Sequence, residues 1–197
     1  MEKYRAIKSK EEKDMKRFFT MVLAISMMGT AVYAAETPAK YAVAKPVVQN
    51  VIFDGNETVM ECYNIEGYNY FRLRDVAEQV TEHIEDPYHH FSVRYNADGG
   101  FVVLERQKAY VQTENSKKYS VGTTDKVGTF SDDRVMFGNL NGIYRFKGYK
   151  VDGYNFYKLR DLARDLEMNV DWDEETETII LTSNTEERAN EIKREAE

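Results

Sequence analysis

Three histidines close together in the sequence are the residues best suited to hold a metal ion. His83, His89 and His90 occur with Glu85 and Asp86 in one stretch of eight residues. Imidazole nitrogens bind zinc and copper well. However, the spacing matches no defined metal motif, and a polar stretch of this kind is equally typical of a solvated loop. Both interpretations stay open, and the spacing favours the loop.

No other pattern in the sequence predicts catalysis. The single cysteine, Cys62, lies in a segment with the alternating pattern of a strand, which favours a buried thiol over an activated nucleophile. The sequence contains no serine-hydrolase elbow, no zinc-protease H-E-x-x-H and no glycine loop for phosphates. We therefore expect a protein that is not an enzyme and has no cofactor.

Aromatic residues are the most informative class, because they gather at two equivalent points. Tyr68, Tyr70, Tyr154 and Phe156 are the candidate binding residues. Strand alternation sends neighbouring side chains to opposite faces, so part of this set is expected to face solvent. Outward rings could stack on the sugar rings of a wall polysaccharide or contact a protein. The alternative, which we favour, is that all of them are ordinary sheet residues that the helix or the other copy covers.

These aromatic residues belong to a sequence repeat. GYNYFRLRDVAEQV begins at Gly67 and GYNFYKLRDLARDL begins at Gly153, 86 positions later. Each phrase contains four apolar residues spaced i, i+3, i+4 and i+7, which predicts a helix with one buried stripe. The residues of the two stripes are Leu73, Val76, Ala77 and Val80 in copy one and Leu159, Leu162, Ala163 and Leu166 in copy two.

Strand patterns surround both predicted helices. In copy one, Asp54-Gly55 is a strong hairpin signal between two strand-like runs. A further hairpin follows each helix, and copy one carries nine additional residues before it, within 81–91. Each copy therefore reads β-β-β-α-β-β. We predict an α+β protein of two small modules, each a short antiparallel sheet packed on one helix.

The organisation of the whole chain follows from the two copies. We predict a signal peptide, an extended lead-in, a first module, a linker, a second module and a charged tail, at residues 1–34, 35–48, 49–110, 111–133, 134–183 and 184–197 respectively.

The N-terminal residues predict export. Lys16 and Arg17 precede an apolar run over 18–32, and small residues precede a cleavage site after Ala34. The alternative is an uncleaved membrane anchor, although the run is short against the roughly 20 residues that a spanning helix needs. Met15 is an alternative start to Met1.

The charge of the chain excludes some partners. The sequence has 27 basic and 34 acidic side chains, and residues 1–34 hold seven and four of them, so the remainder has a net charge of −10. Nucleic acids and anionic membranes attract clustered Lys and Arg. We therefore expect neither nucleic acid nor, after signal cleavage, a membrane as partner. The expected location is secreted or associated with the cell envelope.

The repeated unit resembles a known module. The phrases GYNYFRLRDVA and GYNFYKLRDLARDL, and the run VDWDEETETIIL that follows in copy two, are similar to the copper amine oxidase N-terminal-like module, also called the stalk domain. Its closing V-x-W-D-x-x-T pattern spans 170–176 in copy two. Copy one departs from that pattern, with Tyr95 and Asn96 in place of Trp and Asp.

The resemblance implies binding rather than oxidation. In copper amine oxidases, the copper and quinone chemistry lies in a separate, larger domain that needs N-Y-[DE] and H-x-H motifs. Here Phe71 follows Asn69-Tyr70, and His89 and His90 are adjacent. The resemblance implies an exported, non-catalytic binding or spacer protein of the cell envelope, with a wall polysaccharide or another envelope protein as partner. The alternative is an accessory or regulatory factor for an exported enzyme, binding a metal through the His83–His90 insertion.

Overall fold

A computed structural model describes residues 38–113, 119–137, 143–184 and 194. The strands and helices below belong to the unit that begins at Ala39. The predicted signal peptide and most of the predicted charged tail lie outside the described residues. Within the described part of the chain, no helix is both long enough and apolar enough to cross a membrane.

The two copies have the same order of elements. In copy one these are β1 (Tyr41–Phe53), β2 (Asn56–Ile65), β3 (Tyr68–Arg72), α2 (Leu73–His83), β4 (Phe91–Asn96) and β5 (Phe101–Arg106). In copy two they are β6 (Lys126–Phe137), β7 (Ile143–Val151), β8 (Tyr154–Lys158), α3 (Leu159–Asp165), β9 (Met168–Asp173) and β10 (Thr178–Ser183). This order agrees with the predicted β-β-β-α-β-β pattern. Two strands extend past the predicted boundaries, because β1 begins in the lead-in and β6 begins in the segment predicted as a linker.

Tight turns join the first three strands, and the first of them lies at the predicted Asp54-Gly55 hairpin. Asp54 and Gly55 have φ angles of 46° and 85°, and Glu66 and Gly67 have φ angles of 52° and 83°. Two successive positive φ angles identify the hairpin turn whose twist matches the flanking strands. Gly153 has the same φ as Gly67, so both repeated phrases begin with the same turn.

Both predicted helix stripes are buried. All four stripe residues of α2 are at most 3% exposed. The same holds in copy two, where α3 ends at Asp165 and Leu166 caps it. The predicted periodicity is thus confirmed, and it turns one face of each helix toward the sheet.

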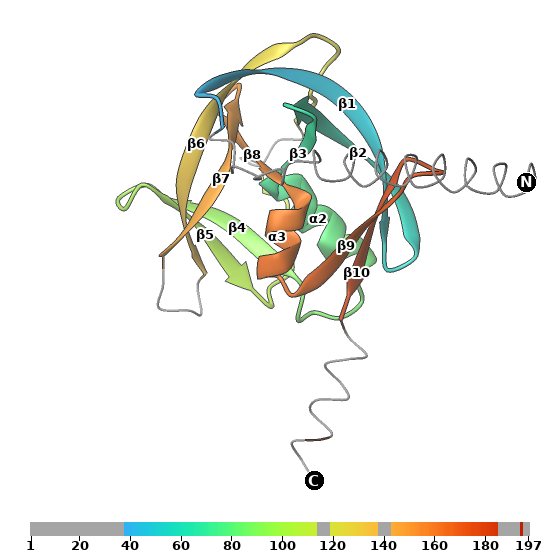
Figure 1. The fold of residues 1–197 in the computed structure, drawn as a ribbon. Helices are drawn as coiled ribbons and strands as arrows, with labels where there is room; N and C mark the ends of the chain where they lie inside the picture. Colours follow the sequence, from blue (N-terminus) through green and yellow to red (C-terminus); the bar gives the residue numbers. More distant parts are fainter. Residues whose placement is uncertain (1–37, 114–118, 138–142, 185–193, 195–197) are drawn as a thin grey trace, which may run out of the picture. The chain divides into compact units, whose positions relative to one another are not determined.

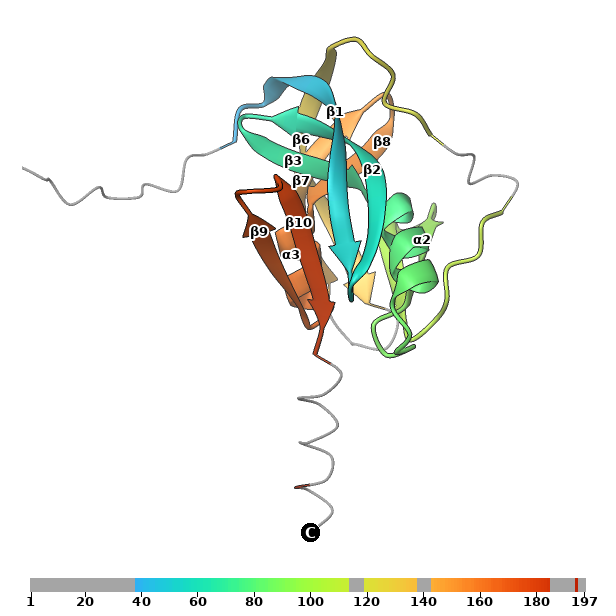
Figure 2. The ribbon, with the colours of Figure 1, turned by 90° about the vertical axis from the view of Figure 1, so that its right-hand side faces the viewer.

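The prediction of two small modules is wrong. The described strands form one mixed ten-stranded sheet in the order β4-β5-β6-β7-β8-β3-β2-β1-β10-β9. An additional pairing of β1 with β6 closes its six central strands into a ring, with Val43 opposite Val127. Figure 1 shows β1 and β6 curving over the top, with α2 and α3 between the two outer hairpins. Figure 2 shows α2 and α3 on opposite sides of the long hairpin of β1 and β2.

The copies are joined by exchange of their closing hairpins. Strand β5 of copy one pairs in parallel with β6 of copy two, and β10 of copy two pairs in parallel with β1 of copy one. This exchange is possible because β1 and β6 are 13 and 12 residues long. Their N-terminal ends pair with each other, and their C-terminal ends each accept a hairpin from the other copy.

An approximate twofold axis relates the copies. Strands β3 and β8 are antiparallel neighbours, and Phe71 lies opposite its repeat equivalent Tyr157. Val43 and Val127, also equivalent by register, lie opposite each other in the β1–β6 pair. The axis therefore passes through the middle of each pair, between its two equivalent residues.

The core has two parts. The larger cluster lies under the helices and contains Phe71, Tyr157 and Cys62, all nearly or fully buried. Burial raises the pKa of the Cys62 thiol to about 12, so the thiol is neutral and protected. The smaller cluster is formed by strands of the closed ring and includes Tyr70 and Phe156.

Candidate functional site

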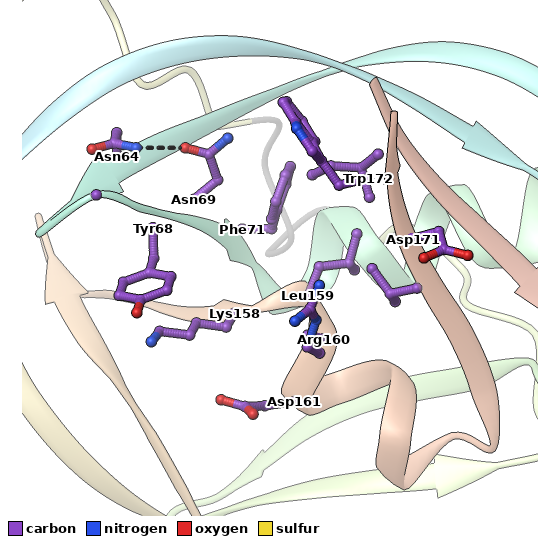
Figure 3. Close-up of a pocket in the computed structure, with 13 residues that line it drawn as sticks. Asn64, Tyr68, Asn69, Phe71, Lys158, Leu159, Arg160, Asp161, Asp171 and Trp172 are labelled. Carbon is purple, nitrogen blue, oxygen red and sulfur yellow. Dashed lines mark hydrogen bonds between the residues drawn. The ribbon is translucent and has the colours of Figure 1, made fainter. Parts of the chain in front are cut away.

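A groove lies beside the start of α3. It has a volume of about 620 Å³. Residues 67–69, 158–161 and 170–172 line it, together with Asn64, Phe71 and Ile179. We call it the first groove, and Figure 3 shows the side chains around it.

A second groove of about 480 Å³ lies beside the start of α2. Residues 72–74, 93–95 and 153–155 line it, together with Val102 and Lys150. Every one of these residues is the repeat equivalent of a residue in the first groove, at offsets of 86 before the closing hairpins and 77 within them. The two grooves are therefore one site that the duplication has made twice.

Each groove is built from both copies. The first groove combines the β2–β3 turn of copy one with the start of α3 and strand β9 of copy two. The second groove combines the β7–β8 turn of copy two with the start of α2 and strand β4 of copy one. Antiparallel pairing of β3 with β8 brings each turn beside the other copy's helix. Neither groove could exist in an isolated module.

Exposed aromatic rings border both grooves. Tyr68 and Trp172 are 58% and 45% exposed in the first groove, and Tyr154 and Tyr95 are 40% and 62% exposed in the second. The predicted candidates thus divide into two kinds. Tyr68 and Tyr154 face solvent, whereas their neighbours Tyr70 and Phe156 are buried in the smaller core.

A cation lies over the tyrosine of each groove. The Lys158 ammonium nitrogen is 3.5 Å from the centre of the Tyr68 ring. Figure 3 shows the two side chains next to each other. Its repeat equivalent, Arg72, has its guanidinium carbon 5.5 Å from the centre of the Tyr154 ring. Attraction between the charge and the ring holds each tyrosine in place beside its groove.

A chain of amides supports the first groove. Asn64 donates a 2.9 Å hydrogen bond to the side-chain oxygen of Asn69 (Figure 3). Asn69 donates to Gln49, and Gln49 donates to the backbone oxygen of Glu177, at 2.8 and 2.7 Å. Since Glu177 lies in the β9–β10 turn, this chain ties copy one to the hairpin that carries Trp172.

A further tyrosine packs against Tyr154, the tyrosine of the second groove. The Tyr119 ring lies 4.5 Å from the Tyr154 ring, and its hydroxyl contacts the hydroxyl of Tyr63 and the carboxylate of Asp152. Burial, followed by the hydrogen bond with Tyr63, raises the pKa of Tyr119, so its hydroxyl stays protonated. Tyr119 comes from the segment predicted as a linker, which therefore contributes to the folded unit.

The three histidines of the predicted metal site have three different neighbours. The buried His89 has its Nδ1 3.0 Å from the backbone oxygen of Leu166, and His90 has its Nε2 2.7 Å from that of Ile84. The His83 ring stacks on Phe53. No group of three or more His, Cys, Asp or Glu among the described residues is placed to hold a metal ion. The insertion instead ties copy one to the end of α3.

Sequence reasoning missed most of the lining residues, among them Trp172, Tyr95, Lys158 and Arg72. Trp172 is the repeat equivalent of Tyr95, and Lys158 is the repeat equivalent of Arg72. This equivalence was the signal in the sequence that could have identified them. The alignment of Tyr95 with Trp172 identified two closing hairpins, but a strand pattern does not say that a ring borders a groove of the other copy.

Comparison of the chain with known protein families, with characterised proteins and with solved structures found no match. The resemblance to the stalk module stays a prediction.

Proposed function

We propose that this protein is an exported, non-catalytic binding protein of the cell envelope, and that its grooves hold segments of a wall polysaccharide. The observation that carries the proposal is the duplicated groove with solvent-exposed aromatic rings at equivalent positions. A large ring is usually covered, and two such rings beside one concave surface indicate a contact with a ligand.

The chemistry of the first groove suits a sugar. A sugar ring has an apolar face of C–H groups and an edge of hydroxyls. Tyr68 and Trp172 supply flat apolar surfaces, while Asn69, Arg160 and Asp161 supply donors and acceptors on the same groove. Ligand sites in general combine apolar walls with a few polar groups that fix orientation.

The polar groups are held in advance of binding. The amide chain fixes Asn64 and Asn69, and the Lys158 charge lies over the Tyr68 ring. Side chains that are already ordered lose less conformational entropy when a ligand binds. This favours a binding role for the groove.

The test is retention on purified bacterial cell wall that has been treated with protease to remove wall proteins. We expect the chain without residues 1–34 to sediment with this material. The double variant Tyr68→Ala, Trp172→Ala should lose most of the retention that depends on the first groove. Tyr154→Ala, Tyr95→Ala should do the same for the second groove.

Tyr41→Ala is the matched control. Tyr41 is 60% exposed and has a lysine over its ring, like Tyr68, but it lines neither groove. Its variant should be retained like the parent chain. Retention that disappears after protease treatment would identify a wall protein as the partner and contradict the proposal. So would equal loss in the Tyr41 variant.

A further inference from the structure

The two grooves differ in charge, although their residues are equivalent. The first groove is lined by two cations and two carboxylates: Lys158, Arg160, Asp161 and Asp171. The second groove is lined by four cations, and no carboxylate is among its lining residues: Arg72, Arg74, Arg94 and Lys150. The duplication has therefore kept the positions that line the site and changed its charge.

The first difference in charge is that Asp161 lines the first groove, whereas its equivalent Asp75 does not line the second. It follows from the presence of Arg72 where the other copy has Lys158. Arg72 is 5% exposed, and its Nε donates 2.9 Å hydrogen bonds to both carboxylate oxygens of Asp75. A guanidinium holds a carboxylate through a planar fork of donors, which an ammonium lacks. Asp75 is thus drawn to Arg72 and does not line the second groove. Its equivalent Asp161 lines the first groove, where Lys158 lies over Tyr68.

The remaining differences in charge come from two positions at which the copies carry different residues. Arg94 of the second groove stands where the first has Asp171, and Lys150 stands where the first has Asn64. The substitution of Arg for Asp alone changes the local charge by two.

The carboxylates that pair with these cations do not line the groove. Arg94 contacts Glu105 and Lys150 contacts Asp133, each at 3.4 Å, and neither carboxylate is a lining residue. Arg74 takes part in no ion pair within the described residues and lies in the first turn of α2, where the helix dipole adds positive potential. An anion in the second groove therefore meets cations before it meets any carboxylate.

We propose that the second groove binds the acidic group of a polysaccharide, a carboxylate or a phosphate, whereas the first groove binds uncharged sugar units. This inference rests on the proposed function of the grooves as polysaccharide sites. The net charge of −10 without residues 1–34 repels polyanions in general, so that binding of one requires a local basic site.

The test compares three soluble polymers by calorimetry at low and high salt: dextran, which is neutral; polygalacturonate, which carries carboxylates; and polyglycerol phosphate. The parent chain should bind at least one of the acidic polymers through one groove per chain, with an affinity that falls as salt rises. Binding of only one of them identifies the acidic group.

Reciprocal exchange of an equivalent pair isolates the charge. Arg94→Asp puts the first groove's residue into the second and should weaken binding of the acidic polymer by about tenfold or more, since one attractive contact becomes repulsive. Asp171→Arg should raise the number of acidic segments bound per chain from one to two. Both side chains are exposed, so folding is not at risk.

The outcomes separate the two proposals. If the parent chain binds dextran and the acidic polymers equally, and Arg94→Asp changes neither, the inference on charge is overturned while the polysaccharide function stands. If no polymer and no wall material is bound, both proposals fail. Loss of dextran binding together with acidic binding in Arg94→Asp would also contradict the division of roles.

Discussion

Because each copy completes its sheet with a hairpin of the other, a defect in copy one should destabilise copy two. Leu104→Ala tests this. Leu104 is 1% exposed in β5 and lies opposite Phe137 of β6. Trp172, the only tryptophan of the chain, lies in β9 at the other end of the sheet and reports on copy two.

The expected loss is about 3 kcal/mol of unfolding free energy, within the range for a buried leucine that leaves a cavity. With a urea dependence of about 2 kcal/mol per molar for a chain of this size, the midpoint should fall by about 1.5 M. If the copies unfold together, Trp172 fluorescence and far-ultraviolet circular dichroism should move by the same amount.

Val111→Ala is the control, because Val111 is 72% exposed in the segment after β5 and its loss should not shift either midpoint. A Trp172 transition that keeps the parent midpoint in Leu104→Ala, while circular dichroism shows a second transition at lower urea, would refute the reasoning. Such a result would mean that the two copies fold as independent modules.

Two further outcomes follow from buried and paired groups. Cys62 should not react with iodoacetamide at pH 8 in the folded chain and should react fully in urea, because burial raises its pKa to about 12; fast labelling of the folded chain would contradict its burial. The hydrogen bond from Tyr88 and, after it, the contacts with Arg106 lower the pKa of Glu167. A lowered folded-state pKa adds stability above the unfolded value of about 4.3, and this contribution is lost as pH falls through the folded value. Glu167→Gln should therefore lower stability at pH 7 by less than about 1 kcal/mol, since the carboxylate is half exposed, and the difference should shrink as the pH is lowered toward 3 in urea titrations. A difference that persists unchanged at pH 3 would refute the charge argument.

The conformation of short segments was predictable because it depends on neighbours in the chain. The stripe of Leu73, Val76, Ala77 and Val80 has the period of a helix, and all four residues are buried. Asp54-Gly55 specified a turn with two positive φ angles, which few residues accept. Repetition of the phrase at Gly153 likewise predicted a second copy with the same order of elements.

The partners of the strands could not be predicted in this way. Alternation in β10 predicts which of its side chains are buried. It does not predict whether β10 pairs with β1 or with β6, because both strands offer the same backbone donors and acceptors. The choice depends on the long-range packing of both copies around α2 and α3, and it overturned the two-module prediction.

The candidate site shows the same division. The repeat was enough to predict that Tyr68 and Tyr154 occupy equivalent positions beside equivalent turns. That each turn faces the helix and hairpin of the other copy depends on the packing of the whole chain, because antiparallel pairing of β3 with β8 brings together residues 86 positions apart. Trp172 and Tyr95 became lining residues through that pairing, and so did the cations that distinguish the second groove from the first.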